Sequence, residues 1–412
     1  MNLVQIIEEL SNLNPPKKSF DNKLMLQALT LVANPQNLYK VIHIAGTNGK
    51  GSTAAFIESG LIGAGFRVGK FSSPYIHIIN ECITINQQMI TDECLANLYL
   101  KYKNILKSAG IYLSSFEMLT FLMFIHCANN NIDYLVLETG LGGRDDSTNV
   151  VDSEFSIITN ISLEHTQFLG DSLASIAKHK AGIIKNGYTV LGDNLVELIN
   201  EVQIHTANYV CVKDKYTILE IKLNIKQFVT ELIFKNNVTN EVFEVQLGLF
   251  GYFQAYNFLC AYEVLSKLNI NWGIIERSVK STIWHGRLQK ISDKPLTIAD
   301  ASHNVDGVRN LVQSLSNWLP YQDSVIICSV LVDKNKSEMI KHYSEISDSI
   351  IFCEIPNQER AIDANVLSDL AIGQFKNIWK FKNPDDALKF AYSLNKSTIV
   401  ITGSCYLLKY FI

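Results

Sequence analysis

Apolar residues gather in short runs that alternate with helical patterns up to about residue 190. The clearest runs are residues 41–45, 134–137, 155–159 and 188–191. Short β-branched runs bounded by polar turns are typical of buried strands. Strands that alternate with helices predict a mostly parallel sheet covered by helices.

The pattern changes between about residues 194 and 246. The segment ELIFKNNVTNEVFEVQL alternates apolar and polar residues on both sides of Asn236 and Asn237. Such alternation around a polar turn predicts a hairpin, and hence a small antiparallel addition. A helical pattern follows at residues 253–268.

A second α/β domain is predicted after a boundary near residues 284–294. Strand and helix patterns resume there and alternate to the end of the chain. We place the boundary so that the domains are residues 1–286 and 287–412. The strands are expected at residues 296–299, 325–330, 350–353 and 398–402, and the helices at 305–318, 336–346, 363–372 and 384–394.

Residues 41–52 read VIHIAGTNGKGS, a strand that breaks into a glycine-rich turn before a helix at residues 53–61. Backbone N–H groups in such a loop can point at phosphate oxygens, and a lysine can reach the outer phosphates. The usual P-loop has Gly where Ile44 stands and Ser or Thr where Gly51 stands. The alternative is a plain glycine turn with an exposed lysine. The predicted phosphate loop contains Gly46, Thr47, Asn48, Gly49, Lys50, Gly51 and Ser52.

The segment DYLVLETGLGGRDDSTN places Glu138 at the end of a buried strand. Ligands of open parallel sheets bind beyond the carboxyl ends of the strands, so Glu138 is expected to face the same crevice as Lys50. A carboxylate there suits a magnesium ligand or a water-positioning group. The alternative is a surface acid at a strand end.

Five further segments carry chemistry-bearing residues, and four of them have an ordinary structural alternative. His165 follows a strand and suits a metal or phosphoryl contact, although a lone histidine is more often structural. Lys180 lies in KHKAGIIK, which on the residues alone reads as the solvated end of a helix. The segment SSP at residues 72–74 is either a plain turn or a hydroxyl-bearing loop. Arg287 in WHGR is a phosphate-binding arginine or a simple linker residue. Asp300 ends a strand in IADASHN, ahead of His303.

Composition restricts the class of protein. The 412 residues are 47% hydrophobic and 18% charged, with a net charge of −4, which suits a globular enzyme with two domains. We see no long Lys/Arg block, so nucleic acid is not an expected partner. The start MNLVQIIEEL is unlike a signal peptide, no apolar run approaches membrane-spanning length, and the 8 cysteines form no C-x-x-C pair. We expect a cytoplasmic protein that does not bind membranes.

Taken together, these segments resemble those of folylpolyglutamate synthase/dihydrofolate synthase, of the Mur ligase superfamily. The resemblance spans residues 18–406 and follows the family's order of motifs. The motifs are AGTNGKGS, SSP with the later Asn80 and Glu81, SFEMLT, LETGLGGRDDSTN, EHTQFLG, HKAGI, HGR and DASHN.

The resemblance implies a role for each candidate residue. The glycine loop would bind ATP, and Lys180 would be carbamylated. Together with Lys50, His165 and Arg287, Lys180 is expected to be catalytic. Positions matching ATP contacts are Asn257, Arg287 and Asp300; those for magnesium are Ser73, Glu138 and His165; those for substrates are Phe116, Glu117, Asp145, Asp146, Ser147 and His303. The cofactors implied are ATP and Mg²⁺, and a monovalent cation is a further candidate.

Three positions depart from the family's usual pattern. Asp145 stands in place of a leucine, His179 in place of a glutamate before the lysine, and Tyr75 in place of a histidine after SSP. These changes bear on the pterin pocket, on the charge beside Lys180 and on the SSP loop.

The implied reaction is ATP-dependent amide ligation through an acyl phosphate, with domain closure excluding water. Substrates would be ATP, L-glutamate, dihydropteroate and reduced folates, and we expect a bifunctional, monomeric enzyme. The alternatives are a monofunctional folylpolyglutamate synthase, another Mur-type ligase, or a P-loop regulatory protein. A peptidoglycan-type Mur ligase is disfavoured because only about 45 residues precede the loop, too few for its extra domain.

Overall fold

The computed structural model describes residues 3–14 and 22–412 of the chain. The first positions of the family resemblance, residues 18–21, lie outside the described residues. The chain forms two compact units. Among the described residues, unit 1 contains 3–14, 22–217, 234–243 and 256–281, and unit 2 contains 218–233, 244–255 and 282–412.

The centre of unit 1 is an eight-stranded sheet in the order β4-β3-β2-β5-β1-β6-β7-β8. Strands β2, β5, β1, β6, β7 and β8 run parallel, and β3 and β4 extend one edge in antiparallel fashion. The strands are β1 (Lys40–Ala45), β2 (Val68–Phe71), β3 (Ile83–Ile85), β4 (Gln88–Met89), β5 (Tyr134–Glu138), β6 (Phe155–Ile158), β7 (Tyr188–Leu191) and β8 (Tyr209–Cys211).

Three neighbouring strands of this sheet end at the same level. Ile44 of β1 is in register with Glu138 of β5, and Ala45 is in register with Ile158 of β6. The connections that follow these strands therefore begin side by side, at the carboxyl edge where open sheets bind ligands.

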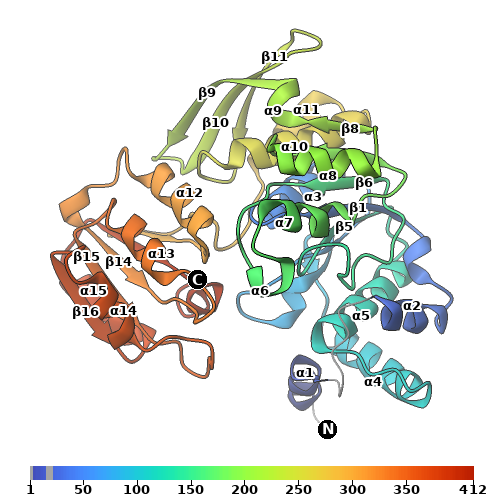
Figure 1. The fold of residues 1–412 in the computed structure, drawn as a ribbon, viewed down its shortest axis with the longest axis horizontal. Coiled ribbons are helices and arrows are strands. Elements are labelled where there is room, and N and C mark those ends of the chain that lie inside the picture. The colour runs from blue at the N-terminus through green and yellow to red at the C-terminus, as the bar shows by residue number, and fades with distance from the viewer. Residues whose placement is uncertain (1–2, 15–21) are drawn as a thin grey trace. The chain divides into compact units, whose positions relative to one another are not determined.

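Helices cover this sheet because its strands are apolar on both faces. Helix α3 packs on β1, β2 and β5 and also on α11, and α7 lies beside α8 (Figure 1). The helices up to residue 280 are α1 (Leu3–Ser11), α2 (Lys23–Thr30), α3 (Lys50–Gly63), α4 (Asp92–Ser108), α5 (Ser115–Asn129), α6 (Thr166–Leu169), α7 (Leu173–Ala181), α8 (Val196–His205), α9 (Val212–Lys215), α10 (Gln254–Lys267) and α11 (Trp272–Lys280), with short 3-10 turns η1 (Pro35–Asn37) and η2 (Ile79–Cys82).

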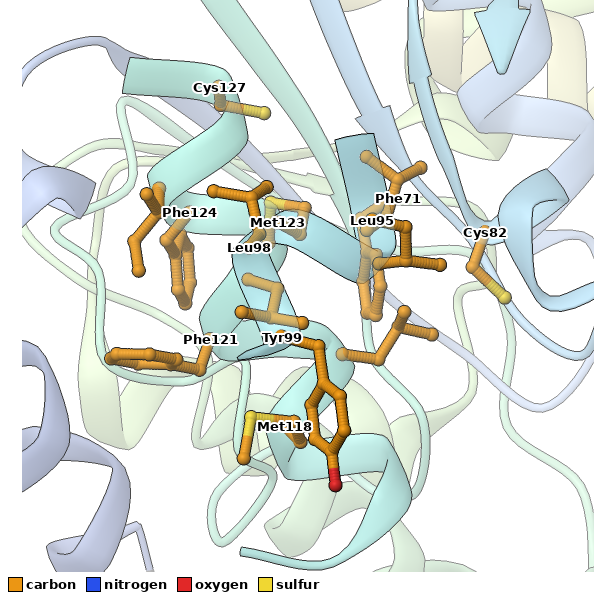
Figure 2. Packing of buried hydrophobic residues seen from close by; sticks show 14 of the residues in the cluster. Phe71, Cys82, Leu95, Leu98, Tyr99, Met118, Phe121, Met123, Phe124 and Cys127 are labelled. Atoms are coloured by element: carbon orange, nitrogen blue, oxygen red, sulfur yellow. The ribbon is translucent and has the colours of Figure 1, made fainter. Parts of the chain in front are cut away.

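One face of the sheet is sealed by an apolar core between α4, α5 and β2. Figure 2 shows Tyr99 of α4 and Phe121 and Phe124 of α5 in this cluster, with Phe71 of β2. All four side chains are fully buried. Burying a side chain of this size contributes about 1.5–3 kcal/mol, so this core fixes the N-terminus of α5 beside the end of β2.

A three-stranded sheet in the order β11-β10-β9 forms the small addition predicted from the alternating pattern. Its consecutive strands are joined by short connections, which can link only antiparallel neighbours. The predicted hairpin is present: Asn236 N donates to Glu241 O at 2.9 Å across the turn. The strands are β9 (Tyr216–Asn224), β10 (Val229–Asn236) and β11 (Val242–Leu247).

Unit 2 contains a six-stranded sheet in the order β12-β13-β17-β14-β15-β16. All neighbours except β12 and β13 pair in parallel. The strands are β12 (Gln289–Asp293), β13 (Leu296–Ala299), β14 (Ser324–Cys328), β15 (Ser349–Cys353), β16 (Asn377–Phe381) and β17 (Thr398–Thr402). The helices are α12 (Val305–Leu315), α13 (Lys336–Tyr343), α14 (Ala364–Ala371), α15 (Pro384–Ser393) and α16 (Cys405–Leu408), with η3 (Tyr321–Asp323).

The predicted fold class is confirmed: a mostly parallel α/β sheet with antiparallel strands, and a second, smaller sheet after it. The boundary between residues 286 and 287 stays a prediction. In the part of the chain that the structure describes, no helix combines the length and apolar character needed to cross a bilayer.

Candidate functional site

The connection between β1 and α3 is a glycine-shaped turn at the carboxyl edge of the sheet. Gly46 and Gly49 have φ angles of +156° and +84°, which residues with a β-carbon rarely adopt. A β-carbon on Gly49 would lie 2.2 Å from Asn257 Oδ1, and one on Gly46 would lie 1.8 Å from Thr159 Oγ1. Both the backbone conformation and the close neighbours therefore require glycine.

Two amides of this loop are already used inside the protein. Thr47 N donates to Asn160 O at 3.1 Å, and Asn48 N donates to Asn160 Oδ1 at 2.8 Å. The first turn of α3 follows directly and includes Gly51 and Ser52. Amides in a first turn have no acceptor within their helix and lie at the positive end of its dipole. This end of the loop suits phosphate oxygens.

The loop is also tied to the connection that follows β6. Ser162 N donates to Thr47 Oγ1 at 3.0 Å, and Thr159 Oγ1 donates to Asn48 O at 2.5 Å. These contacts join two connections that the chain separates by more than a hundred residues. The glycine loop and the start of the segment leading to His165 are therefore held together.

Lys50 folds back over its own loop. Its Nζ donates to Gly46 O at 3.0 Å and to Thr47 O at 3.3 Å. The same Nζ lies 3.9 Å from Glu138 Oε1, and both side chains are largely buried. The predicted proximity of Lys50 and Glu138 is confirmed, and the ammonium of Lys50 lies beside the loop that is predicted to bind phosphate.

Lys180 is a buried lysine near the end of α7. Burial, together with the nearby charge of Lys50, lowers the pKa of Lys180 to about 7, while Glu164 acts in the opposite direction. A large fraction of Lys180 is therefore an uncharged amine near neutral pH. The reading of this segment as a solvated helix end is wrong at Lys180, because the side chain is turned into the protein.

His165 stands at the start of α6 with a φ of +51°. A non-glycine residue in this region is uncommon, and such strain often accompanies function. His165 Nε2 lies 3.9 Å from Glu164 Oε1. The connection after β6 thus presents an imidazole beside a carboxylate.

The predicted magnesium ligands are Ser73, Glu138 and His165. Within residues 3–14 and 22–412, no group of three or more His, Cys, Asp or Glu side chains is arranged to hold a metal. The predicted set contains two such side chains and a hydroxyl. Mg²⁺ usually keeps several waters and binds one or two carboxylates with substrate phosphates, so the buried Glu138 carboxylate fits this ion. The ligand assignment stays a prediction.

The loop after β5 is folded around the buried side chain of Asp146. Asp146 Oδ2 accepts from Leu141 N at 2.7 Å, and Oδ1 accepts from Thr148 N at 3.0 Å and Thr148 Oγ1 at 2.6 Å. Thr148 Oγ1 also lies 2.9 Å from Nε2 of His43, a buried residue of β1. Burial raises the pKa of Asp146, although these donors act in the opposite direction. Asp146 shapes the loop predicted to bind the pterin.

The other predicted substrate residues of unit 1 surround this loop. The Phe116 ring covers Gly140 so closely that a β-carbon there would lie 2.4 Å from it. Ser147 Oγ lies 3.3 Å from Thr120 Oγ1. Glu117 instead closes the cap of α5, since its Oε2 accepts from Ser114 N at 2.7 Å. The geometry brings Phe116 and Ser147 to one place and gives Glu117 a structural partner.

Two of the residues that depart from the family pattern meet in space. Asp145 Oδ2 lies 3.5 Å from His179 Nδ1. Asp145 also accepts hydrogen bonds from Arg144 Nε and Nη2 at 3.0 and 2.8 Å. The charge changes at positions 145 and 179 therefore belong to one cluster.

In unit 2, Asp300 holds the backbone around Arg287. Its Oδ2 accepts from Leu288 N and its Oδ1 from Ser302 N, each at 2.8 Å. Asp300 is buried, and His303 Nδ1 lies 2.9 Å from Ala301 O. Asp300 fixes the residue that follows Arg287 and thereby the start of the arginine side chain.

Three residues of this site were missed by the sequence interpretation: Glu164, Asn160 and Ser162. All lie in the connection after β6, in the segment TNISLEH from which only His165 was selected. The available signal was the run of polar residues directly after a strand that neighbours β1. Their partners are distant in the chain, so the contacts themselves were not readable.

Comparison with known proteins agrees with this geometry. The Mur ligase middle domain family matches residues 44–265, and the Mur ligase glutamate ligase domain family matches residues 286–405. The folylpolyglutamate synthase of Lacticaseibacillus casei is 30% identical over 429 residues, covering 99% of this chain and 97% of that protein.

Two further similarities cover nearly the whole chain. The dihydrofolate synthase/folylpolyglutamate synthase of Bacillus subtilis (strain 168) is 32% identical over 404 residues, covering 93% of this chain and 92% of that protein. The solved structure of Mycobacterium tuberculosis folylpolyglutamate synthase with ADP and AMPPCP has a TM-score of 0.90 at 25% identity, covering 99% of this chain and 98% of that chain. This chain belongs to the folylpolyglutamate synthase/dihydrofolate synthase family of the Mur ligase superfamily.

Proposed function

We propose that this protein is an ATP-dependent ligase that joins L-glutamate to dihydropteroate and to the γ-carboxylate of reduced folates. The observation that carries the proposal is the grouping of Lys50, Glu138 and Lys180 at the glycine loop. The family supports the ligase chemistry. The double name of the Bacillus subtilis relative supports activity on both substrates.

In the first step, a carboxylate oxygen of the folate substrate attacks the γ-phosphorus of ATP. The bond from that phosphorus to the bridging oxygen breaks, ADP leaves, and an acyl phosphate forms. Lys50 would exchange its two loop carbonyls for phosphate oxygens and neutralise their charge. The first-turn amides of α3 would orient the same phosphates.

In the second step, the amine of L-glutamate attacks the acyl carbon. The tetrahedral intermediate collapses with loss of phosphate, and the amine proton passes to solvent. Positioning and charge neutralisation are the main contributions expected from the protein. We assign nucleotide contacts to Asn257, Arg287 and Asp300 and a substrate contact to His303.

Magnesium would be held by Ser73, Glu138 and His165 together with phosphate oxygens. When bound, it would supply positive charge to the phosphates of ATP. Glu138 fits this role because its carboxylate is buried at the carboxyl end of β5, within 3.9 Å of Lys50.

We also propose that Lys180 is carbamylated. Its neutral amine would attack carbon dioxide, lose a proton to solvent and become a carboxylate-bearing group. The charge of Lys50 disfavours an ammonium at Lys180, and the same charge would stabilise a carbamate. The buried setting therefore suits the modified form better than the charged amine.

We place the enzyme in the cytoplasm as a monomer. All 8 cysteines are free thiols, as in a reducing compartment.

The test is to supply purified protein with ATP, Mg²⁺ and L-glutamate, and either dihydropteroate or tetrahydrofolate. The expected result is phosphate release that depends on both co-substrates and a product heavier by one glutamyl residue. Turnover of tetrahydrofolate alone would favour the monofunctional alternative. Turnover of neither, with release of phosphate on another carboxylate, would favour a different Mur-type ligase.

A further inference from the structure

We propose that Asp145 is a positioning residue that clamps the loop of residues 139–149 onto the helix carrying Lys180. The clamp is the bridge that its carboxylate makes between Arg144 and His179. The inference rests on the proposed function, which assigns this loop to the pterin substrate.

The carboxylate of Asp145 contacts both partners. It accepts from Arg144 Nε at 3.0 Å and from Nη2 at 2.8 Å, and its Oδ2 lies 3.5 Å from His179 Nδ1. Contacts through two guanidinium nitrogens fix the orientation of an arginine as well as its charge. His179 is mostly buried, with its side chain 18% exposed, so the bridge closes on a fixed surface rather than on a mobile side chain.

The bridge lies over a close backbone contact between the loop and α7. Arg144 N donates to His179 O at 2.7 Å. Asn149 Nδ2 donates to Arg144 O at 2.9 Å and to Gly182 O at 3.0 Å. A β-carbon on Gly143 would lie 2.8 Å from His179 O. The loop therefore rests directly on the end of the helix, one residue from Lys180.

The charges beside this helix end favour a carboxylate at position 145. The last turn of α7 carries Lys178, His179 and Lys180. Because burial lowers the pKa of both His179 and Lys180, the side chains here that keep a positive charge near neutral pH are Lys178 and Arg144. Burial lowers the pKa of His179, Arg144 lowers it further, and Asp145 acts in the opposite direction. Asp145 thus supplies the negative charge that pairs with Arg144 where the loop meets the helix.

The clamp acts within the segment predicted to contact the pterin, since Asp145 is itself one of the predicted substrate residues. Asp145 immediately precedes Asp146 and Ser147, and both of these are buried. Release of position 145 would let these two residues shift relative to Lys180. The expected loss falls on the affinity for the pterin substrate, whereas the glycine loop that binds ATP has its own separate contacts.

A double-mutant cycle tests the clamp in the full-length protein. The variants are Asp145→Leu, His179→Glu and the two combined. We expect Asp145→Leu to raise KM for dihydropteroate about fivefold or more, with KM for ATP changed less than about twofold. The combined variant should recover most of this loss, because a carboxylate at position 179 can pair with Arg144. Glu220→Gln, which removes an exposed pair with Lys222, is the matched control.

Hydrogen exchange without substrates separates the clamp from the proposed function. Amides of residues 140–149 should exchange faster in Asp145→Leu than in the wild type and the control. If Asp145→Leu exchanges faster than the wild type but the wild type itself ligates no glutamate, the clamp stands and the proposed function is rejected. A ligating enzyme whose Asp145→Leu variant has unchanged KM and unchanged exchange would overturn the clamp. So would a combined variant whose effects are simply additive.

Discussion

Asn257 Oδ1 occupies the space into which a β-carbon at position 49 would project, 2.2 Å from where that atom would lie. Helix α10 therefore packs so closely on the glycine loop that position 49 has no room for a side chain. The loop and the helix are fitted to each other, and Gly49 is where this fit is most easily broken.

Gly49→Ala should weaken ATP binding about tenfold or more, because it adds both backbone strain at φ +84° and a clash with Asn257. Titration calorimetry with a non-hydrolysable ATP analogue measures this. Gly65→Ala is the matched control, since Gly65 has a φ of +90° but no atom within 4 Å of its β-carbon position. Equal loss in both variants would show that strain alone is responsible.

Lys50→Ala should reduce glutamate ligation by about 100-fold or more while the protein stays folded. Its ammonium donates to two carbonyls of the loop, where it can neutralise the charge of phosphate oxygens in the first step. Phosphate release and circular dichroism provide the two readouts. Lys222→Ala, on an exposed strand, is the control. Near-normal ligation by folded Lys50→Ala would reject the assignment of this loop.

Lys180 should make the stability of the carbon dioxide-free protein depend on pH. Its pKa is about 7 in the folded protein, against an ordinary value of 10.5 for a lysine. Between these values unfolding takes up a proton, so the free energy of unfolding rises as the pH increases from about 7 to about 10. Urea unfolding at several pH values measures the slope.

Lys180→Met should lack this slope and be more stable than the wild type at pH 7 without carbon dioxide. Lys178→Met is the control, because that side chain is exposed. Adding bicarbonate should stabilise the wild type and leave Lys180→Met unchanged. An identical pH slope in the wild type and Lys180→Met would contradict the burial of a neutral amine.

Asp300→Asn should lower the free energy of unfolding by about 1–3 kcal/mol, because a buried amide group cannot accept from both Leu288 N and Ser302 N. Leu288 directly follows Arg287, which is a proposed nucleotide contact. Loss of the bond to Leu288 N should therefore displace Arg287 and lower the affinity for ATP as well. Chemical denaturation and ATP titration give the two values. Asp293→Asn, whose side chain is 79% exposed, should change neither.

The sheet of unit 1 was predictable because its strands are apolar on both faces and end in polar or glycine-rich connections. Parallel strands place those ends at one edge of the sheet. The order of strands and loops along the chain was therefore enough to predict that Lys50 and Glu138 lie close together. Strand β16 was not predicted, because residues 377–381 are half-buried or exposed and mix aromatic with polar side chains. Its partner β15 supplies the pairing that the local pattern does not indicate.

The finer contacts of the site were not readable from the sequence. Asn160 and Ser162 bind a loop more than a hundred residues away, and only the assembled sheet makes them neighbours. The burial of Lys180 has the same origin: KHKAGIIK looks solvated until Arg144 and Gly143 pack on the helix end. The resemblance pointed to Lys180, but it did not reveal the contact between Asp145 and His179.

The hydrogen bonds from the glycine loop to Asn160 and Ser162 have a thermodynamic consequence. Whatever orders the loop also orders the segment that leads to Glu164 and His165, since the same bonds hold both. Nucleotide affinity and the rigidity of that segment are then linked quantities, each changing the other by the same factor. A mutation at Asn160, which need not touch ATP, would be felt as a change in nucleotide binding.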